Sequence, residues 1–293
     1  MSKPIVWTIA GSDSGGGAGV QADIKVINQL GAHACSVITA LTAQNTIGTG
    51  RLDWVAPDML TAQIEALGTD LPPAAVKLGM LGTKEAVEII AALLKKLKVP
   101  FTVCDPVLIS SSGTFLLEPN AWKTLTDTLF PVTDLITPNI PEAEHLFGMQ
   151  ITTPADIEAA AKKALSLGVK EVLIKGGHGE HDMDLSSDYW SNGEEHAWLS
   201  SPRIDTKSSH GTGCFLSSSI AAARARGCGP LESIVLAKAY LNQGLRQAPE
   251  LGNGYGPLAF NPWEQDEQDL PFISRKVTEP GTRADFPAFG NPA

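Results

Sequence analysis

Residues 4–41 read PIVWTIAGSDSGGGAGVQADIKVINQLGAHACSVITAL, and their pattern determines the class of fold. The apolar run 4–10 is typical of a buried strand, and it leads into a glycine-rich turn. Apolar residues then recur every three or four positions between 20 and 30, which is the period of a helix, and Gly31 ends that helix. Residues 33–41 are again strand-like. The segment is therefore predicted to form the strand, helix and strand from which parallel sheets are built.

Strand-like and helical runs continue to alternate over most of the chain. Further strands are expected at 75–80, 101–107, 135–138 and 169–175, and further helices at 57–67, 83–96, 154–168, 212–226 and 230–246. An Asn-Gly step between aromatic residues predicts a small β-hairpin around 186–200. The expected fold is a three-layer α/β/α arrangement, with a mostly parallel central sheet and helices on both faces. Such sheets bind ligands beyond the carboxyl ends of their strands, so the residues after each strand are the candidates for a site.

The length of 293 residues favours about two domains, but single α/β domains of this size are common. Apolar residues make up 43% and charged residues 18%, as in an ordinary globular protein. The core shows no internal boundary, so we predict a single domain over residues 1–262. Residues 263–293 are rich in Pro, Gly and charge and have no period, and we expect a loosely ordered tail.

The formal net charge is −10, which argues against nucleic acid or an anionic membrane as a partner. A single nucleotide is compatible with this charge when a divalent cation accompanies it. The four cysteines show neither disulfide nor metal-ligand spacing, and no apolar run is long enough for a secretory signal or a membrane span. We therefore expect a cytoplasmic protein.

The first loop, GSDSGGGAG at residues 11–19, satisfies a relaxed dinucleotide fingerprint between a strand and a helix. A dinucleotide site needs an acidic residue about 20 positions later, and residues 24–52 contain none. The loop also lacks the lysine of a P-loop. We interpret it as a loop whose backbone a ligand can approach, with a plain strand-to-helix turn as the alternative.

Residues 209–216, SHGTGCFL, place glycines directly before an apolar helix. Free N–H groups and the helix dipole make a helix N-terminus a good anion site. At that position the thiol of Cys214 is expected to have a lowered pKa. The alternative is a buried structural cysteine beside a helix cap. Cys35, Cys104 and Cys228 are interpreted as unreactive, and most of the six histidines as surface residues.

Polar residues follow three other predicted strands. Asp105 ends one strand, Asn139 and Glu142 follow the next, and Lys175 ends a third. Carboxylate and amide oxygens are ligands that Mg²⁺ prefers, so this edge is predicted to hold the cation. The alternatives are a turn cap for Asp105, a first-turn helix residue for Glu142 and a solvated side chain for Lys175.

Six motifs, taken together and in order, resemble the bacterial hydroxymethylpyrimidine/phosphomethylpyrimidine kinases of thiamine biosynthesis. They are AGSDSGGGAGVQADIK (10–25), ALTAQN (40–45), VKLGML (76–81), TPNIPEAE (137–144), LIKGGH (173–178) and HGTGC (210–214). The resemblance covers about residues 4–260. It implies a ribokinase-like fold, and ATP with Mg²⁺ as cofactors. It also implies two phosphorylations, first of the hydroxymethyl group of the pyrimidine and then of the monophosphate.

The resemblance also assigns roles to residues of this sequence. The substrate pocket would be lined by Gly11, Asp23, Gln44, Met80 and Val107. Asp23 would hold the hydroxymethyl or amino group of the pyrimidine, and the amide of Gln44 suits its aminopyrimidine edge. The nucleotide and metal groups would be Lys175 and Asn139, with Glu142 and Asp105 at the metal. The anion hole would be formed by Gly211, Thr212 and Gly213, with Cys214 taking the hydroxyl proton or orienting the hydroxyl.

One departure from the family pattern is Ser111, in a stretch where the family often has Lys. Pyridoxine or pyridoxal kinase activity, alone or in addition, is the nearest alternative function, because that ring also carries a hydroxymethyl group. A non-catalytic ligand-binding protein of the same fold is a more distant alternative. Dimers are common in the resembling family, so we expect a homodimer.

Overall fold

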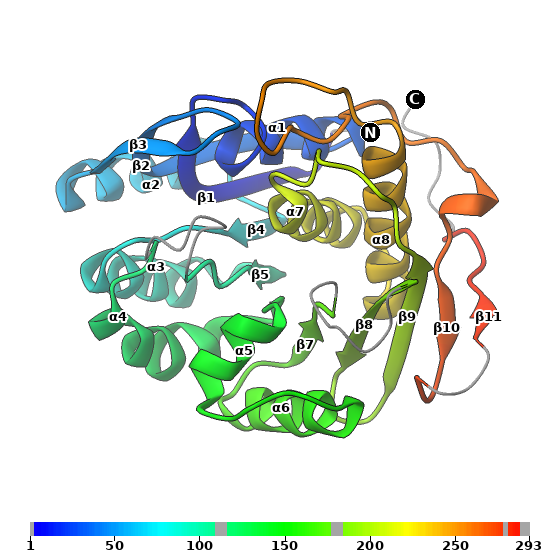
Figure 1. Ribbon diagram of the computed structural model, residues 1–293. Helices are drawn as coiled ribbons and strands as arrows, with labels where there is room; N and C mark the ends of the chain where they lie inside the picture. Colours follow the sequence, from blue (N-terminus) through cyan, green and yellow to red (C-terminus); the bar gives the residue numbers. More distant parts are fainter. Residues whose placement is uncertain (1–2, 109–115, 177–183, 278–280, 288–293) are drawn as a thin grey trace.

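In the described part of the chain, eleven strands form one sheet that runs through the whole molecule (Figure 1). The computed structural model describes residues 3–108, 116–176, 184–277 and 281–287. In chain order the strands are β1 (Ile5–Asp13), β2 (His33–Gln44), β3 (Thr49–Trp54), β4 (Ala75–Leu78), β5 (Thr102–Cys104), β6 (Leu135–Ile136), β7 (Glu171–Ile174), β8 (Leu185–Ser191), β9 (His196–Pro202), β10 (Phe272–Ser274) and β11 (Thr282–Arg283). Their order across the sheet is β11-β10-β9-β8-β7-β6-β5-β4-β1-β2-β3.

Helices cover both faces of the sheet (Figure 1). They are α1 (Gly19–Gln29), α2 (Pro57–Asp70), α3 (Lys84–Leu97), α4 (Pro119–Thr124), α5 (Ile140–Phe147), α6 (Pro154–Ser166), α7 (Thr212–Ala225) and α8 (Pro230–Arg246), with short π- or 3-10-helical turns at Leu125–Leu129, Phe130–Val132 and Glu267–Asp269. Buried side chains of α2 to α6 pack on one face, and those of α1, α7 and α8 pack on the other. The predicted three-layer α/β/α fold is confirmed. No helix of the described residues combines the length and apolar character needed to cross a membrane.

The middle of the sheet is parallel, because β1, β2 and β4 to β7 all run in one direction. Successive side chains of β1 enter opposite layers: Trp7 and Ile9 lie in one hydrophobic cluster and Val6 lies in the other. All three side chains are fully buried. Burial on both faces explains why these strands appear as continuous apolar runs in the sequence.

The predicted hairpin is confirmed as the antiparallel pair of β8 and β9. Gly193 takes the left-handed conformation in its turn, with φ = 90°. The side-chain oxygen of Asn192 accepts hydrogen bonds from the N–H groups of Glu194 at 3.0 Å and Glu195 at 2.7 Å. The Asn-Gly step therefore forms the turn because glycine tolerates a positive φ and because the Asn side chain bonds the turn backbone.

The antiparallel pair of β2 and β3 has no counterpart in the sequence prediction. β2 continues to Gln44 and pairs there with β3, whose residues are exposed except for the partly buried Leu52. A strand exposed on both faces shows no apolar alternation, so periodicity does not reveal it. We call residues 41–54 the flap, and it forms one edge of the sheet (Figure 1).

The expectation of a loosely ordered tail after residue 262 is wrong for the described residues. Trp263 and Leu270 are buried against α8 and its neighbours, and Trp263 lies edge-on to the Tyr240 ring at 5.8 Å. The guanidinium of Arg246 donates a hydrogen bond to the Asp269 carboxylate, and β10 pairs with β9. The segment lacks a period because its anchors are isolated side chains rather than one face of a helix or strand.

The packing of the segment after residue 262 can be tested by truncating one of its buried side chains. Leu270→Ala should lower the free energy of unfolding by about 2–5 kcal/mol, because it empties a buried site. The matched variant Leu251→Ala removes the same atoms from a side chain that is 55% exposed, and it should change little. Urea denaturation of the two variants makes the comparison. Equal stabilities would restore the expectation of a loose tail.

Candidate active site

The N-terminus of α7 begins at Thr212, as predicted, and Gly211 precedes it. Gly211 has φ = 87°, and a Cβ atom on it would lie 2.0 Å from the carbonyl oxygen of Gly17. Only glycine fits this close approach to the first loop. The first helical hydrogen bond is donated by the N–H of Phe215 to Gly211 at 2.8 Å. The N–H groups of residues 212–214 come before that bond and form an anion-binding end.

Asp105 and Lys175 lie directly beside this helix end. Lys175 Nζ is 2.7 Å from Asp105 Oδ1. A Cβ atom on Gly213 would lie 2.8 Å from Asp105 Oδ2 and 3.3 Å from Lys175 Nζ. Burial lowers the pKa of Lys175, but the nearby Asp105 and Glu142 carboxylates outweigh it, so the pKa is raised and the amine stays charged. The structure therefore places a cation at the mouth of the anion-binding end.

Asn139 and Glu142 form the N-terminal cap of α5. The Glu142 N–H donates to Asn139 Oδ1, and the Asn139 N–H donates to Glu142 Oε2, both at 2.8 Å. Glu142 therefore caps the helix from its first turn, which is the alternative role given for it in the sequence analysis. Burial, followed by the charge of Asp105, raises the pKa of Glu142 to about 7, although Lys175 and backbone N–H groups act in the opposite direction. Asp105 and Glu142 are thus two buried carboxyl groups that repel each other when both are ionised.

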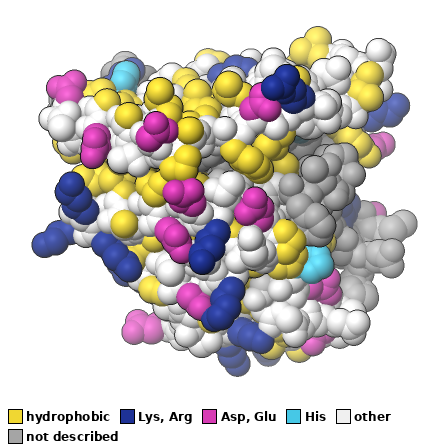
Figure 2. Space-filling view, turned by 90° about the vertical axis from the view of Figure 1, so that its left-hand side faces the viewer, with side chains coloured by type: hydrophobic (Ala, Val, Ile, Leu, Met, Phe, Trp, Pro, Cys, Tyr) yellow, Lys and Arg dark blue, Asp and Glu magenta, His cyan; other side chains and the backbone are white. Residues whose placement is uncertain are grey.

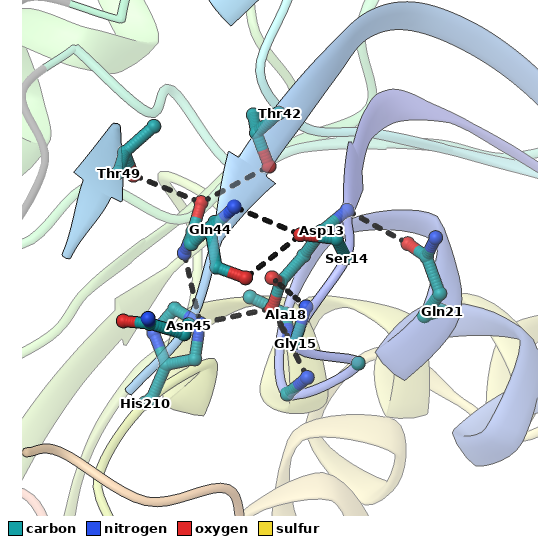
Figure 3. Close-up of polar contacts among 12 residues, drawn as sticks. Asp13, Ser14, Gly15, Ala18, Gln21, Thr42, Gln44, Asn45, Thr49 and His210 are labelled. Atoms are coloured by element: carbon teal, nitrogen blue, oxygen red, sulfur yellow. Dashed lines mark hydrogen bonds and ion pairs between the residues drawn. The ribbon is translucent and has the colours of Figure 1, made fainter. Parts of the chain in front are cut away.

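Gln44 lies at the end of β2, where the flap meets the first loop (Figure 3). Ser14 Oγ both donates to the Gln44 carbonyl at 2.7 Å and accepts from its N–H at 2.8 Å. An open hollow of about 620 Å³ lies beside Gln44. It is lined by Ser14, Ala43, Gln44, Asn45, Ile47, Gly48, Thr49 and Gly50. The carboxamide thus borders a space that a small ring can enter.

Gly11 of β1 and Met80, which follows β4, pack against each other. A Cβ atom on Gly11 would be 2.2 Å from Met80 Cε, so the end of the Met80 side chain packs directly against the Gly11 backbone. Thr39 Oγ1 donates to the Met80 carbonyl at 2.6 Å and fixes that backbone. Val107 follows Asp105 in a tight turn, with a 2.8 Å hydrogen bond from its N–H to the Asp105 carbonyl. Gly11 therefore lies near the carboxyl end of β1, while Met80 and Val107 follow β4 and β5.

Comparison with known proteins agrees with this geometry. The family described as phosphomethylpyrimidine kinase matches residues 13–259. The hydroxymethylpyrimidine/phosphomethylpyrimidine kinase of Synechococcus elongatus is 42% identical over 258 residues, which are 88% of this chain and 97% of that protein. The chain belongs to the phosphomethylpyrimidine kinase family. The phosphomethylpyrimidine kinase of Clostridium difficile 630 has a solved structure with 39% identity and a TM-score of 0.74, covering 82% of this chain and 99% of that one. A pyridoxal kinase of Staphylococcus aureus in complex with AMP-PCP gives 27% identity and a TM-score of 0.86, covering 94% and 99%.

The role predicted for Asp23, a direct contact to the substrate, does not fit its position in this kinase. Both Asp23 and Lys77 are fully buried, and Lys77 Nζ lies 2.7 and 2.9 Å from the two carboxylate oxygens. Thr8 Oγ1 at 2.5 Å and Ser218 Oγ at 2.6 Å also donate to the same carboxylate. Asp23 therefore links α1 to β1, β4 and α7 through its hydrogen bonds.

The expectation of a lowered pKa for Cys214 is also wrong. Burial and the carboxylates of Asp23 and Asp105 raise the pKa of the thiol, and together they outweigh the charge of Lys77 and a hydrogen bond from the Gly19 N–H, so that the pKa is about 11. The helix N-terminus that suggested a thiolate is present, but burial outweighs it. The resting side chain is a neutral thiol.

Three buried or partly buried residues escaped the sequence analysis: Asp13, Lys77 and His210. The sequence did contain a signal for Lys77, because a lysine inside an apolar strand needs a buried partner. Asp13 had one too, because it ends a strand as Asp105 does. His210 had none, and it is not among the histidines at the surface: its side chain is 22% exposed and contacts Asp13 and Gln44 (Figure 3). Ser111, Gly177 and His178 lie outside the described residues.

The buried ion pair gives a stability prediction. Asp23→Asn keeps the shape but leaves Lys77 without a counter-charge, and it should lower the free energy of unfolding by about 3–5 kcal/mol. The double variant Asp23→Leu, Lys77→Met removes both charges and should recover part of that loss. Asp53→Asn, which changes an exposed pair with Arg51, serves as the control. A loss no larger than that of the control would contradict the structural role of Asp23.

Proposed function

We propose that this kinase phosphorylates the hydroxymethyl group of 4-amino-5-hydroxymethyl-2-methylpyrimidine with ATP, and then phosphorylates the monophosphate to the diphosphate. The observation that carries the proposal is the position of the α7 N-terminus, which lies beside a charged lysine in a chain of the phosphomethylpyrimidine kinase family. Solved structures of a similar Staphylococcus aureus pyridoxal kinase in complex with AMP-PCP and with ADP support the use of ATP.

The α7 N-terminus supplies charge stabilisation for the transferring phosphoryl group. Phosphoryl transfer depends on positioning and on neutralising the equatorial oxygens more than on covalent chemistry. The N–H groups of Thr212, Gly213 and Cys214 are held by the close packing of Gly211 on Gly17, so they need no reorganisation. Each such donor stabilises a transition state by about 2.7–4 kcal/mol in other enzymes. Lys175 adds a full positive charge at the same place.

Cys214 orients the attacking hydroxyl as a neutral thiol. A thiol with a pKa of about 11 holds its own proton at pH 7 and cannot accept another. In a loose transition state the hydroxyl keeps its proton until late, when the proton can pass to an oxygen of the transferred phosphoryl group, so orientation matters more than early deprotonation. Of the two roles predicted for Cys214, orientation is the one that this site favours.

Asp105 and Glu142 suit a magnesium ion. Both carboxylates are buried, at 2% and 7% exposure, and their mutual repulsion helps to raise the pKa of Glu142. A divalent cation relieves such repulsion, and Mg²⁺ binds through one or two carboxylates together with substrate phosphates. When bound, it would neutralise phosphate charge. Asn139 holds Glu142 through the α5 cap, and a contact of its own to the nucleotide remains a prediction.

The pyrimidine pocket is assigned to Gly11, Gln44, Met80 and Val107. Gln44 offers a donor and an acceptor beside the open hollow, which complements the amino group and ring nitrogen of the substrate edge. The arrangement binds a small ring with one polar edge.

Pyridoxal kinase activity is the second candidate function. The observation in its favour is the TM-score of 0.86 with the Staphylococcus aureus pyridoxal kinase, against 0.74 with the Clostridium difficile phosphomethylpyrimidine kinase. Sequence identity points the other way, at 27% against 39%. Both rings carry the hydroxymethyl group that this site phosphorylates.

We also infer a cytoplasmic homodimer. Large apolar side chains of β2, β3 and α2 are exposed, among them Leu41 at 54% and Met59 at 56%. Figure 2 looks onto the side where these elements lie in Figure 1, and hydrophobic side chains gather across its upper part. Contiguous exposed apolar surface is typical of an interface between subunits. The four free cysteines suit a reducing compartment.

The deciding experiment is an ADP-release assay of the purified chain. Its substrates are the hydroxymethylpyrimidine, its monophosphate, pyridoxine, pyridoxal and ribose. Preference for the first two supports the proposal. Preference for pyridoxine and pyridoxal would replace it with the second candidate, and ADP release with none of the five would reject both.

The role of Cys214 predicts a split between turnover and binding. Cys214→Ala should lower kcat by about 10–100-fold with little change in KM, because the hydroxyl loses its orienting contact. Alkylation of Cys214 by iodoacetamide, followed by peptide mass spectrometry, should accelerate with pH up to pH 10, since the thiolate forms only near pH 11. Cys228→Ala is the control. A plateau in alkylation below pH 8 would contradict the neutral thiol.

The raised pKa of Glu142 predicts a pH effect on stability. Between about pH 4.5 and pH 7 the folded chain keeps a proton that the unfolded chain has lost, so stability decreases as pH rises through this window. Glu142→Gln removes this contribution, and urea denaturation at pH 5 and pH 8 measures it. Glu232→Gln is the matched control, because Glu232 also caps a helix, at Gly229, but at an exposed site. Equal pH slopes in wild type and Glu142→Gln would contradict the assignment.

A further inference from the structure

One nitrogen of His210 contacts two groups that make opposite demands on it (Figure 3). His210 Nε2 lies 3.0 Å from Asp13 Oδ2 and 3.1 Å from the nitrogen end of the Gln44 carboxamide. A ring nitrogen that carries hydrogen can donate to Asp13 but cannot accept from an amide N–H. A ring nitrogen without hydrogen can accept from the amide but repels the carboxylate. One of the two groups must therefore adapt.

Asp13 is the group that cannot adapt. Its Oδ1 accepts the Gly15 N–H at 2.8 Å, and its Oδ2 accepts the N–H groups of Gly17 at 3.0 Å and Ala18 at 2.8 Å. Burial raises the pKa of this carboxyl, but the hydrogen bonds from His210 and from the loop outweigh it, and the pKa is lowered. An ionised carboxylate only accepts hydrogen bonds, and bonds to it are the stronger kind. His210 Nε2 therefore carries a hydrogen, whatever the total charge of the ring.

Gln44 can adapt, because its carboxamide occupies the same space in two orientations. Turning its carboxamide by 180° exchanges oxygen and nitrogen at the same two positions. The oxygen then accepts from His210, and the NH₂ group faces the hydroxyls of Thr49, at 3.0 Å, and Thr42, at 3.3 Å. Both hydroxyls can accept as well as donate. The order of donor and acceptor along the Gln44 edge is thus set by Asp13 through His210.

The His210 ring is held firmly enough to transmit this choice. The main-chain N–H of His210 donates to the Gly256 carbonyl at 3.1 Å. A Cβ atom on Gly17 would lie 2.8 Å from His210 Cδ2, so the ring packs directly on the first loop. The loop that carries Asp13 and the segment that leads into α7 are therefore locked to each other through this side chain.

We propose that His210 and Asp13 are positioning residues that fix the Gln44 carboxamide in one orientation and so select an aminopyrimidine over a hydroxypyridine. The inference deepens the proposed function and rests on the role of Gln44 given there. An aminopyrimidine presents a donor, the amino group, next to an acceptor, the ring nitrogen, and it fits a carboxamide in only one order. A ring hydroxyl both donates and accepts, so it tolerates either order. Loss of the orientation should therefore penalise the pyrimidine more than the pyridine.

Steady-state kinetics of full-length variants with hydroxymethylpyrimidine and with pyridoxine test the proposal. His210→Leu should lower kcat/KM for the pyrimidine by about tenfold, mainly through KM, and should lower the value for pyridoxine by about threefold or less. His210→Gln keeps an N–H donor for both partners and should restore most of the ratio between the substrates. His33→Gln, at the opposite end of β2 and exposed, is the control.

Equal losses for the two substrates would assign His210 a merely structural role, and no loss in His210→Leu would also overturn the proposal. A second measurement does not depend on the substrate. ¹⁵N NMR of the His210 ring in the ligand-free chain should show a hydrogen on Nε2, and an unprotonated Nε2 would overturn the proposal. Failure of the proposed function is recognised separately, as wild-type chain that phosphorylates neither ring while Nε2 still carries its hydrogen; in that case the selection between the two rings is rejected and only the tautomer stands.

Discussion

The buried ion pair between Lys77 and Asp23 joins the elements that position the anion-binding end of α7. Lys77 belongs to β4 and Asp23 to α1, while Thr8 of β1 and Ser218 of α7 donate hydrogen bonds to the same carboxylate. Both charges are fully buried, and removing each from water costs several kcal/mol. That cost is offset only while the pair and its hydrogen bonds stay intact. Because Ser218 lies within α7, its hydrogen bond to Asp23 also ties the helix to the sheet behind the proposed phosphate site.

The class of fold could be predicted because its signals are local. Apolar periodicity gives each buried strand and each helix, and a single Asn-Gly step gives the hairpin at residues 192–193. The flap and the tail could not be predicted in this way. β3 is exposed on both faces, and the tail is anchored by separate side chains such as Trp263 and Leu270. In both segments the contacts that create order come from residues far away in the sequence.

The candidate site was predictable to a similar degree. The rule that ligands bind beyond parallel strands locates Asp105 and Lys175, and the structure brings them to the same helix end. Asp23 was assigned to the pocket by the family resemblance, and neither that resemblance nor the rule shows that Asp23 is buried as the partner of Lys77. For Cys214 the sequence shows the helix N-terminus, which favours a thiolate, but not the burial and the carboxylates that favour a thiol.

The substrate edge of the site is the part that sequence reasoning reaches least, because three distant segments build it. The first loop, the flap and the segment before α7 meet where Asp13, Gln44 and His210 make contact (Figure 3). A fourth segment holds them in place: the Tyr255 N–H donates to the carbonyl of Thr46 at the flap tip, at 2.9 Å. A Cβ atom on Gly254 would lie 2.0 Å from that same carbonyl oxygen, so the loop approaches the flap as closely as backbone allows. In the proposed function phosphate binding uses the α7 N-terminus and Lys175, whereas the proposed choice of ring depends on the hydrogen bonds among Asp13, Gln44 and His210. Kinases with the same phosphate site can therefore differ in the ring they accept without a change of fold.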